Sequence, residues 1–482
     1  MSRPARSGMV TDPAARRIEE GATPDAWRVA ALAILGGGAL AGYLAGRSRF
    51  GGAVTALTAG VAVGCVVPIA LAGRKPPITP EAAEEALWHT AEPPTFSVLV
   101  GARDEAGVLP ALVADVAGQD YRDDAGRPRF ELVVVDDRST DDSGEVVLRA
   151  AREAGIEAVT RVVRREGADL PDGKGAALTA AQPDLCRGDV VVVLDADARI
   201  EPWFLRRAAG YFAAGARAVT ARRMILDAES GWLAGAQADE QTLDGEINRG
   251  RWAMGGCSEF RGNGIMIRRD LLAEVGGWRA EALTEDIDLS SRIAAGAGER
   301  VVWAVDVEVW EEPVRSVEDL WRQRLRWAEG AFRRLFDHGP AVVSSRHLSA
   351  RSRLDFAAYV GQLAVPTLVV GAAVAAARGR RRPLLAVLGG YLGVSAALAW
   401  DSLRWSREPE GTPVGGRPRL WRALRVALFG GLWLLAVPGA LLRLAVGGGR
   451  IRYHKMEHGG TDDKVAAADT GTKRVRGQIS RR

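Results

Sequence analysis

The sequence predicts a doubly wound α/β domain that is flanked by membrane-spanning helices. In the middle of the 482-residue chain, short apolar runs alternate with helical patterns. Strands that are apolar on both faces and separated by helices are typical of a parallel sheet covered on both sides. Toward both ends, stretches without Lys, Arg, Asp or Glu reach the length that a membrane helix needs. These stretches are residues 50–73, 356–377 and 383–400.

The N-terminal part is expected to form a cytoplasmic tail, residues 1–28, and a transmembrane hairpin, residues 29–73. A first apolar run, residues 29–46, is followed after only RSRF by the second run, which argues against a cleaved signal peptide. By the positive-inside rule, arginines before the first run and basic residues after the second place both flanks in the cytoplasm. These residues are Arg3, Arg6, Arg16, Arg17 and Arg28 before the hairpin, and Arg74 and Lys75 after it.

The α/β domain is expected over residues 95–340, after a proline-rich linker at residues 74–94. In a doubly wound sheet, ligands bind at the carboxyl ends of the strands. The strands are expected at residues 96–102, 131–137, 158–163 and 189–197, with helices at residues 107–119 and 143–155 between them.

Acidic residues stand at the ends of two predicted strands. One apolar run leads into Asp195 and Asp197, and another ends in Asp136 and Asp137. Two carboxylates one residue apart can hold a divalent cation, Mg²⁺ or Mn²⁺, that also bridges substrate phosphates. The alternative is a solvated turn or a helix cap, where Asp is common. A P-loop is excluded, because DGKGA at residues 172–176 lacks the Ser or Thr after the lysine.

Seven segments in order resemble the motifs of family 2 glycosyltransferases with the GT-A fold. They are FSVLVGARDEA, LVVVDDRSTDDS, DGKGAAL, VVVLDADARI, FRGNGIMIRRDLLAEVGGW, LTEDIDLSSRI and QRLRW. The resemblance covers about residues 95–330 and is to the membrane-embedded branch that includes cellulose, chitin and hyaluronan synthases and ceramide glucosyltransferase. It implies a nucleotide-sugar donor, expected to be a UDP-sugar. Asp104 departs from the family, where Asn is more frequent.

The resemblance also implies roles for single residues. Asp286 corresponds to the general base, and Glu285 and Trp327 border the acceptor. Asp195 and Asp197 correspond to ligands of the metal and of the nucleotide diphosphate. The other residues expected to bind the nucleotide sugar are Ala102, Arg103, Glu105, Asp136 or Asp137, Lys174, Gln323 and Arg326.

An amphipathic helix is predicted near residues 317–336. At about 100° per residue, Gln323, Arg326 and Trp327 share one side and are expected to face the diphosphate. The opposite side is apolar and is expected to lie in the membrane interface, the alternative being an ordinary amphipathic helix of the soluble domain. That side consists of Val317, Leu320, Trp321, Leu325, Ala328, Phe332, Leu335 and Phe336, flanked by Arg322, Arg324 and Arg333.

Residues 356–446 are expected to form the C-terminal transmembrane region, and residues 447–482 a basic, disordered tail. A weaker third span is residues 426–442. Three spans would place the basic tail and RGRRR, residues 378–382, outside the cell, against the charge rule. One of the three segments is therefore a candidate for a re-entrant or interfacial position.

The sequence therefore predicts an inverting, metal-dependent glycosyltransferase in the plasma membrane, with several spans and a cytoplasmic catalytic domain. The expected acceptor is a growing polysaccharide, and the alternative is a membrane lipid that is reached laterally. A rival of another class is a membrane scaffold that binds a nucleotide without transferring sugar. Nucleic acid is excluded as a partner, because no basic stripe with interleaved aromatic residues is present. No oligomeric state is predicted.

Overall fold

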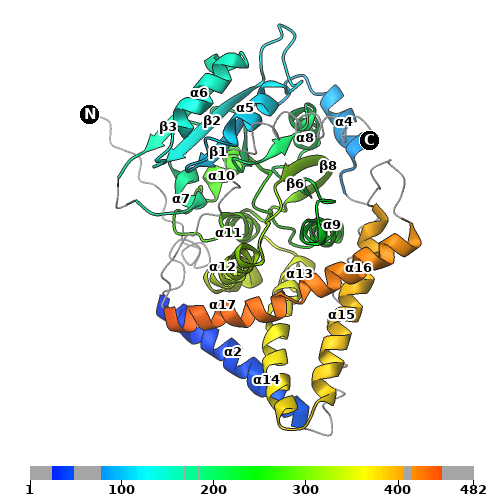
Figure 1. Ribbon diagram of the computed structural model, residues 1–482. Helices are drawn as coiled ribbons and strands as arrows, with labels where there is room; N and C mark the ends of the chain where they lie inside the picture. The colour runs from blue at the N-terminus through cyan, green and yellow to red at the C-terminus, as the bar shows by residue number, and fades with distance from the viewer. Residues whose placement is uncertain (1–23, 48–76, 168–169, 182–184, 406–414, 448–482) are drawn as a thin grey trace.

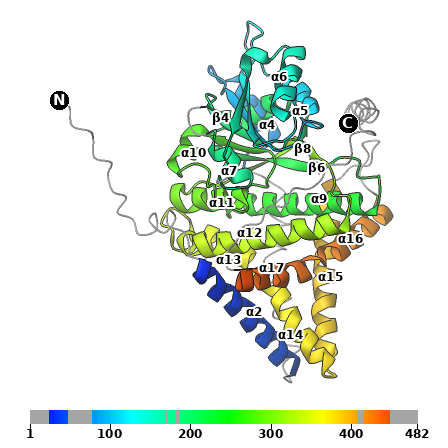
Figure 2. The same cartoon turned by 60° about the vertical axis from the view of Figure 1, so that its left-hand side comes forward.

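The computed structural model describes residues 24–47, 77–167, 170–181, 185–405 and 415–447. A mixed α/β domain stands on a group of long helices, several of which project away from it (Figures 1 and 2). The second run of the expected hairpin and the expected C-terminal tail lie outside the described residues.

The centre of the domain is an eight-stranded sheet with the order β3-β2-β1-β4-β7-β6-β8-β5. The strands β3, β2, β1 and β4 are parallel, as expected. The rest of the sheet, which was not predicted, is mixed, because β7 runs antiparallel to both β4 and β6. The strands are β1 (Phe96–Ala102), β2 (Phe130–Asp137), β3 (Thr160–Arg165), β4 (Val190–Leu194), β5 (Arg199–Ile200), β6 (Ala218–Ile225), β7 (Ile265–Arg268) and β8 (Val302–Glu311).

Both faces of the sheet are buried, which explains the continuous apolar strands. In β1, Val98 and Val100 belong to one core cluster, and Leu99 between them belongs to the other. Alternate residues of a strand point to opposite faces, so each face needs its own apolar set. The first cluster includes residues of α5 (Leu109–Ala117), α6 (Ser143–Glu153) and α8 (Phe204–Ala213). The second includes residues of α7 (Lys174–Thr179), α10 (Arg269–Glu274) and α11 (Glu285–Arg292).

The segment expected to be a linker contains the helix α4 (Pro80–Trp88). Its first turn is capped by Thr79, whose hydroxyl accepts a hydrogen bond from the backbone N–H of Ala82 at 3.2 Å. Ala83 is buried, and a Cβ built on Gly210 of α8 would lie 2.6 Å from the carbonyl oxygen of Ala83. The close approach of the two helices fixes this segment against the domain.

The predicted amphipathic helix is α12 (Val317–Ser344), which is longer than expected. It lies below the sheet beside α9 (Trp232–Ala253), α11 and α13 (Ala350–Gly361) (Figure 2). On its apolar side, Ala328 and Phe332 pack in one cluster with Ala31, Val437 and Leu441. This apolar side therefore holds the catalytic domain against the helices α2 (Pro24–Arg47) and α17 (Trp433–Gly447).

Three arginines, Arg322, Arg324 and Arg333, flank the apolar side of α12, and they differ in burial. Arg324 and Arg333 are buried and pair with Glu240 and Glu329. A guanidinium can be buried in this way when a carboxylate accompanies it. Only Arg322 of the three is half exposed, with 50% of its side chain accessible. Two of the three arginines are therefore held by carboxylates inside the protein.

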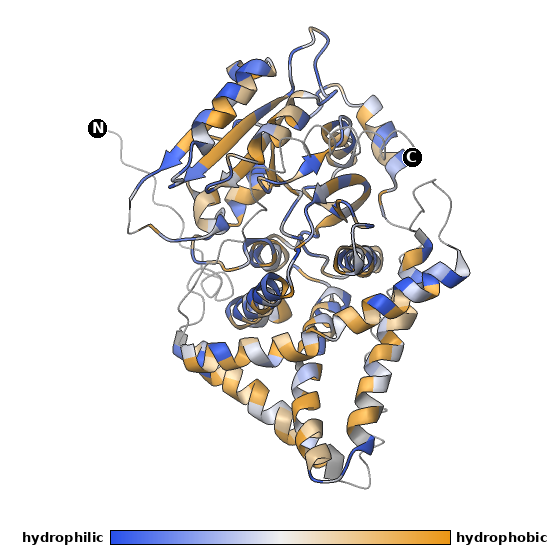
Figure 3. Cartoon of the chain, in the orientation of Figure 1, coloured by the Kyte–Doolittle hydropathy of each residue, from blue (hydrophilic) through white to orange (hydrophobic). Residues whose placement is uncertain are grey.

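Three helical segments of the described chain are long and apolar enough to cross a membrane: Asp25–Leu44, Ala350–Ala377 and Gly416–Gly447. The second includes the short η3 (Gln362–Ala364) and α14 (Val365–Ala377), and the third consists of α16 (Gly416–Gly430) and α17. The expected span at residues 383–400 forms α15 (Arg382–Ser402). Apolar residues dominate the projecting helices in Figure 3.

The helices α16 and α17 lie across the direction of α14 and α15 (Figures 1 and 2). Two arginines of α16 fasten it to the domain helix α9, where Arg422 and Arg425 pair with the fully buried Asp239 at 2.7 and 2.5 Å. The third candidate span, Gly416–Gly447, therefore begins with a helix that is attached to the domain.

Candidate active site

A large continuous cavity of about 1130 Å³ begins at the carboxyl edge of the parallel strands and reaches helices that include parts of two candidate membrane spans. Its upper part is lined by the loops after β1, β2 and β4, by the start of α11 and by one side of α12. Its lower part is lined by η3 and the helices α14, α15, α16 and α17. The volume exceeds the range of about 300–1,000 Å³ that is usual for small-molecule sites. The cavity therefore has room for more than one substrate.

The loops after β1 and β2 are tied to each other by hydrogen bonds. The backbone N–H of Glu105 donates to the hydroxyl of Ser143 at 2.8 Å. Asp104 has a φ of +52°, and its Oδ1 accepts a hydrogen bond from the backbone N–H of Thr140 at 2.6 Å. Asp and Asn are the side chains that tolerate this left-handed conformation best, so Asp104 supplies the acceptor oxygen that Asn would supply. Ala102, Arg103 and Glu105 line the cavity as expected.

The two adjacent aspartates at the end of β2 have different surroundings. Asp137 lines the cavity and pairs with Arg138 at 2.9 Å and with Arg165 at 2.8 Å. Asp136 is 1% exposed and accepts a hydrogen bond from the backbone N–H of Ser139 at 3.0 Å. Of these two aspartates, Asp137 lines the cavity and Asp136 does not, and Asp136 instead holds the turn after the strand.

Lys174 connects three parts of the site. Its Nζ lies 2.5 Å from Oδ1 of Asp195, donates to the carbonyl oxygen of Gly262 at 2.7 Å, and lies 3.6 Å from Oε1 of Glu285. Burial lowers the pKa of Lys174, but the charges of Asp195 and Glu285 together hold it above its ordinary value. The lysine therefore remains a cation between two carboxylates.

Asp195 and Asp197 follow β4 directly and both line the cavity. No group of three or more His, Cys, Asp or Glu side chains in the described part of the chain could hold a metal ion by itself. Mg²⁺ commonly binds through one or two carboxylates and completes its shell with water and substrate phosphates. The side chain of Asp195 is 37% exposed. The pair therefore fits a cation that a nucleotide diphosphate completes.

The acidic residues at the start of α11 have separate partners. Asp286 accepts a hydrogen bond on Oδ2 from the backbone N–H of Gly262 at 2.7 Å. Glu285 is 7% exposed, and burial, opposed by Lys174, raises its pKa to about 7. The backbone N–H of Gly262 thus donates to Asp286, and its carbonyl oxygen accepts from Lys174. These two bonds fix the start of α11 relative to the acidic edge of the sheet.

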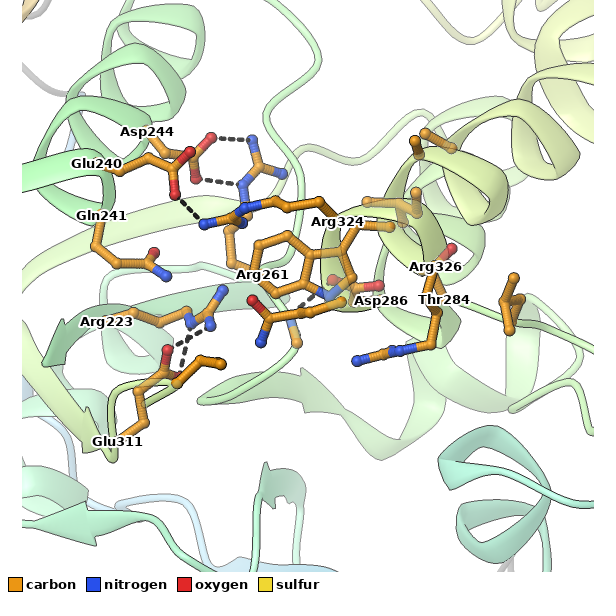
Figure 4. A pocket seen from close by; sticks show the side chains of 18 of the residues that line it. Arg223, Glu240, Gln241, Asp244, Arg261, Thr284, Asp286, Glu311, Arg324 and Arg326 are labelled. Atoms are coloured by element: carbon orange, nitrogen blue, oxygen red, sulfur yellow. Dashed lines mark hydrogen bonds and ion pairs between the residues drawn. The ribbon is translucent and has the colours of Figure 1, made fainter. Parts of the chain in front are cut away.

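The helix α12 closes the upper cavity from below, and Gln323, Arg326 and Trp327 line it. Figure 4 shows Arg326 near Thr284 and Asp286. The Trp327 ring lies between two guanidinium groups, with its centroid 4.5 Å from Cζ of Arg324 and 5.7 Å from Cζ of Arg223. Such cation–π contacts fix the ring plane. All the candidate residues except Asp136 therefore meet at one cavity.

Sequence reasoning missed a set of paired charges that also line the cavity, among them Arg261 with Asp244 (Figure 4). Arg261 pairs with Asp244 at 2.5 Å, and Arg334 pairs with Glu259 at 3.0 Å. Burial raises the pKa of Glu259, but Arg334 and its other arginine neighbours lower it to about 2. Arg261 stands inside the segment FRGNG, directly before Gly262, so the motif carried a signal for this residue. Asp244 and Arg334 stand in helices without such a signal.

Comparison with known proteins gives one family. The profile of the family described as "Glycosyltransferase like family 2" matches residues 93–330. A beta-monoglucosyldiacylglycerol synthase from Synechocystis sp. is 32% identical over 397 residues, which are 80% of this chain and 80% of the relative. A protein of the same name from Nostoc sp. is 29% identical over 385 residues, which are 77% of this chain and 78% of the relative.

Among solved structures, the chain is similar to a mannosyltransferase from Pyrobaculum calidifontis in complex with GDP-Man and Mn²⁺. The similarity has a TM-score of 0.51, with 21% identity, and covers 87% of this chain and 99% of that chain. It therefore supports the fold that the strand order and the flanking helices show.

Proposed function

The chain belongs to family 2 of the glycosyltransferases, and from that premise we propose that it transfers one glucose from UDP-glucose to the hydroxyl of diacylglycerol. The observation that carries this proposal is the cavity that joins the acidic edge of the sheet to the membrane helices. A donor that is soluble in water and an acceptor that is soluble in lipid both need access to one site. The names of the two relatives support glucose and diacylglycerol as the substrates.

The chemistry of the lower cavity favours a lipid over the polysaccharide that the sequence favoured. Its lining there includes Leu363, Pro366, Val394, Leu398 and Val437. Such side chains offer no partners for the many hydroxyls of a polysaccharide, and buried polar groups without partners are costly. Acyl chains need no such partners. The lipid acceptor therefore replaces the growing polymer as the preferred reading.

The donor is proposed to bind along the carboxyl edge of the sheet. Ala102, Arg103, Glu105 and Asp137 surround the nucleoside, in loops that hydrogen bonds hold in place. Asp195 and Asp197 hold the diphosphate side. A Mg²⁺ or Mn²⁺ ion bound there would supply positive charge to the departing diphosphate. Lys174, Gln323 and Arg326 add hydrogen-bond donors around the same group.

Asp286 is proposed to be the general base. Its Oδ2 is held by the backbone N–H of Gly262 at 2.7 Å, which fixes the carboxylate and leaves the other oxygen for the acceptor hydroxyl. The acceptor oxygen then attacks the anomeric carbon, the bond to the diphosphate breaks, and the hydroxyl proton passes to Asp286. One displacement inverts the anomeric configuration. Glu285 positions Lys174, and Trp327 borders the acceptor.

The test compares the parent protein with Asp286→Asn in membranes that contain diacylglycerol. We expect the variant to lose at least about 100-fold in UDP release, because general bases contribute about 10²–10⁴-fold, while its affinity for UDP stays within twofold. Asp124→Asn, in an exposed loop, is the matched control and should behave as the parent. Equal UDP release from parent and Asp286→Asn would rule out this base, and UDP binding without turnover in the parent would support the scaffold alternative.

A further inference from the structure

We propose that the acceptor lipid enters the site sideways, through the seam between α14 and α15, and lays its acyl chains along one face of α15. This inference rests on the proposed lipid acceptor and deepens it by naming the route and the residues. The seam is defined here by Leu363 of η3 with Val365 and Pro366 of α14 on one side, and on the other side by the residues of α15 that line the cavity, Gly390, Tyr391, Val394, Ser395 and Leu398.

One face of α15 lines the cavity. Gly390, Tyr391, Val394, Ser395 and Leu398 contribute to the lining. These positions recur every three or four residues, which places them on a single side of a helix. An apolar helix face normally packs against a neighbouring element. Here that face borders an open space that is continuous with the residues around Asp286.

The packing of α15 agrees with this reading. None of its described side chains before Ala399 is buried, and a Cβ built on Gly389 or Gly393 would meet no described atom within 4 Å. Ala399 and Ser402, near the end of the helix, are buried. The helix is therefore anchored at one end and loosely packed along the rest of its length.

The helix α14 is packed closely on its other side. A Cβ built on Gly371 would overlap the backbone of Ala39, and one built on Gly42 would overlap the backbone of Leu368, so α14 and α2 touch along their backbones. Small residues permit such close contact between membrane helices. A lipid cannot pass between α2 and α14 without separating them. In Figure 1, α14 and α15 lie close together at their far ends and diverge toward the domain, and both contribute residues to the lining of the cavity.

The polarity along the route matches an amphipathic acceptor. The cavity has Asp286 and Arg326 in its upper part, and the wall of the seam combines the polar Gln362 and Ser395 with apolar side chains such as Val394 and Leu398. The hydroxyl of Tyr391 already donates to the carbonyl oxygen of Gly430 at 2.8 Å, so this tyrosine fixes the wall. A lipid with a hydroxyl head, ester groups and two acyl chains carries both kinds of group.

The experiment narrows the seam and measures dependence on acyl-chain length. Leu398→Trp and Val394→Trp each place an indole in the route. Leu385→Trp makes the same change on the same helix at a position that is 65% exposed and does not line the cavity. Each full-length variant is assayed with UDP-glucose and either dioleoylglycerol in phosphatidylcholine vesicles or dihexanoylglycerol, and its affinity for UDP is measured separately.

We expect each seam variant to lose at least about tenfold in kcat/KM for dioleoylglycerol and less than threefold for dihexanoylglycerol, with the affinity for UDP within twofold of the parent. The control Leu385→Trp should match the parent in all three measurements. If the seam variants have the same kcat/KM for dioleoylglycerol as the control, the proposed route is wrong, although lipid transfer by the parent would still support the proposed function. An equal loss with both lipids and with UDP would also overturn it, since that pattern indicates a packing defect. A parent without any glucosylated lipid would overturn the proposed function, and the route with it.

Discussion

Gly330 of α12 lets this helix approach the start of α11, and its replacement by alanine should separate the two halves of the site. A Cβ built on Gly330 would overlap the side chain of Thr284 and lie 2.9 Å from its Cβ. Thr284 is buried and directly precedes Glu285 and Asp286. Its side chain is short and β-branched, so it cannot turn aside without moving the backbone. In Gly330→Ala, α11 and α12 therefore have to move apart.

The size of the effect follows from two opposing terms. Overpacking of a close contact costs about 1–3 kcal/mol, and alanine in a helix interior is better than glycine by about 0.5–1 kcal/mol. The net loss in the free energy of unfolding should therefore be about 0.5–2 kcal/mol. Activity should suffer more, because a displacement of about 1 Å can lower a rate by about 10²-fold. We expect at least a tenfold loss of kcat.

The assay is UDP release in the presence of diacylglycerol, together with Tm, for Gly330→Ala and for Gly339→Ala. Gly339 lies on the same helix, and a Cβ there would meet only the flexible end of Leu335, with Cδ1 at 2.8 Å. Gly339→Ala should keep its activity and gain slightly in Tm. The reasoning would be refuted if Gly330→Ala kept its activity within twofold and gained in Tm like the control.

Three further predictions concern the acidic edge. Removal of divalent cations with EDTA should abolish UDP release, and Mn²⁺ or Mg²⁺ should restore it; undiminished turnover in EDTA would contradict the role of Asp195 and Asp197. Because the pKa of Glu285 is raised to about 7 from the ordinary 4.5, its stabilising contribution is present at low pH and is lost as the pH rises through about 7. At pH 8, Glu285→Gln should therefore have a higher Tm than the parent, and its free energy of unfolding should be larger by up to about 3 kcal/mol. At pH 4 the two proteins should have the same Tm. An equal difference at both pH values would count against this titration of Glu285. Asp137→Asn should weaken UDP binding at least tenfold and Asp136→Asn less than threefold, as measured by calorimetry; the reverse order would reverse their assignment.

The first half of the sheet could be predicted from the sequence because both of its faces are buried. The strand β1 spans Phe96–Ala102, as expected, since an uninterrupted apolar run leaves little freedom in placing it. The strand β8 escaped prediction because it carries charges such as Asp306 and Glu308. These charges are paired, Glu308 with Arg222 of β6 at 3.5 Å and Asp306 with the hydroxyl of Tyr211 at 2.6 Å. From the sequence alone such a strand resembles a solvated segment.

The candidate site could be predicted wherever a residue stands inside a motif. Asp195 and Lys174 are 21 positions apart in sequence and in contact in the structure. The choice between Asp136 and Asp137 required coordinates, because neighbours on a strand point to opposite faces. The seam between α14 and α15 is also invisible in the sequence. It depends on which face of α15 lines the cavity, and only the placement of the other described helices decides that.

The most direct test of the account is the identity of the product. Purified protein, UDP-glucose, Mn²⁺ and vesicles containing diacylglycerol are incubated together, and the lipid and polymer fractions are analysed by mass spectrometry. The account predicts a diacylglycerol that carries one hexose, in a yield that Asp286→Asn abolishes. A polymer of many hexoses without a glycosylated lipid would contradict it.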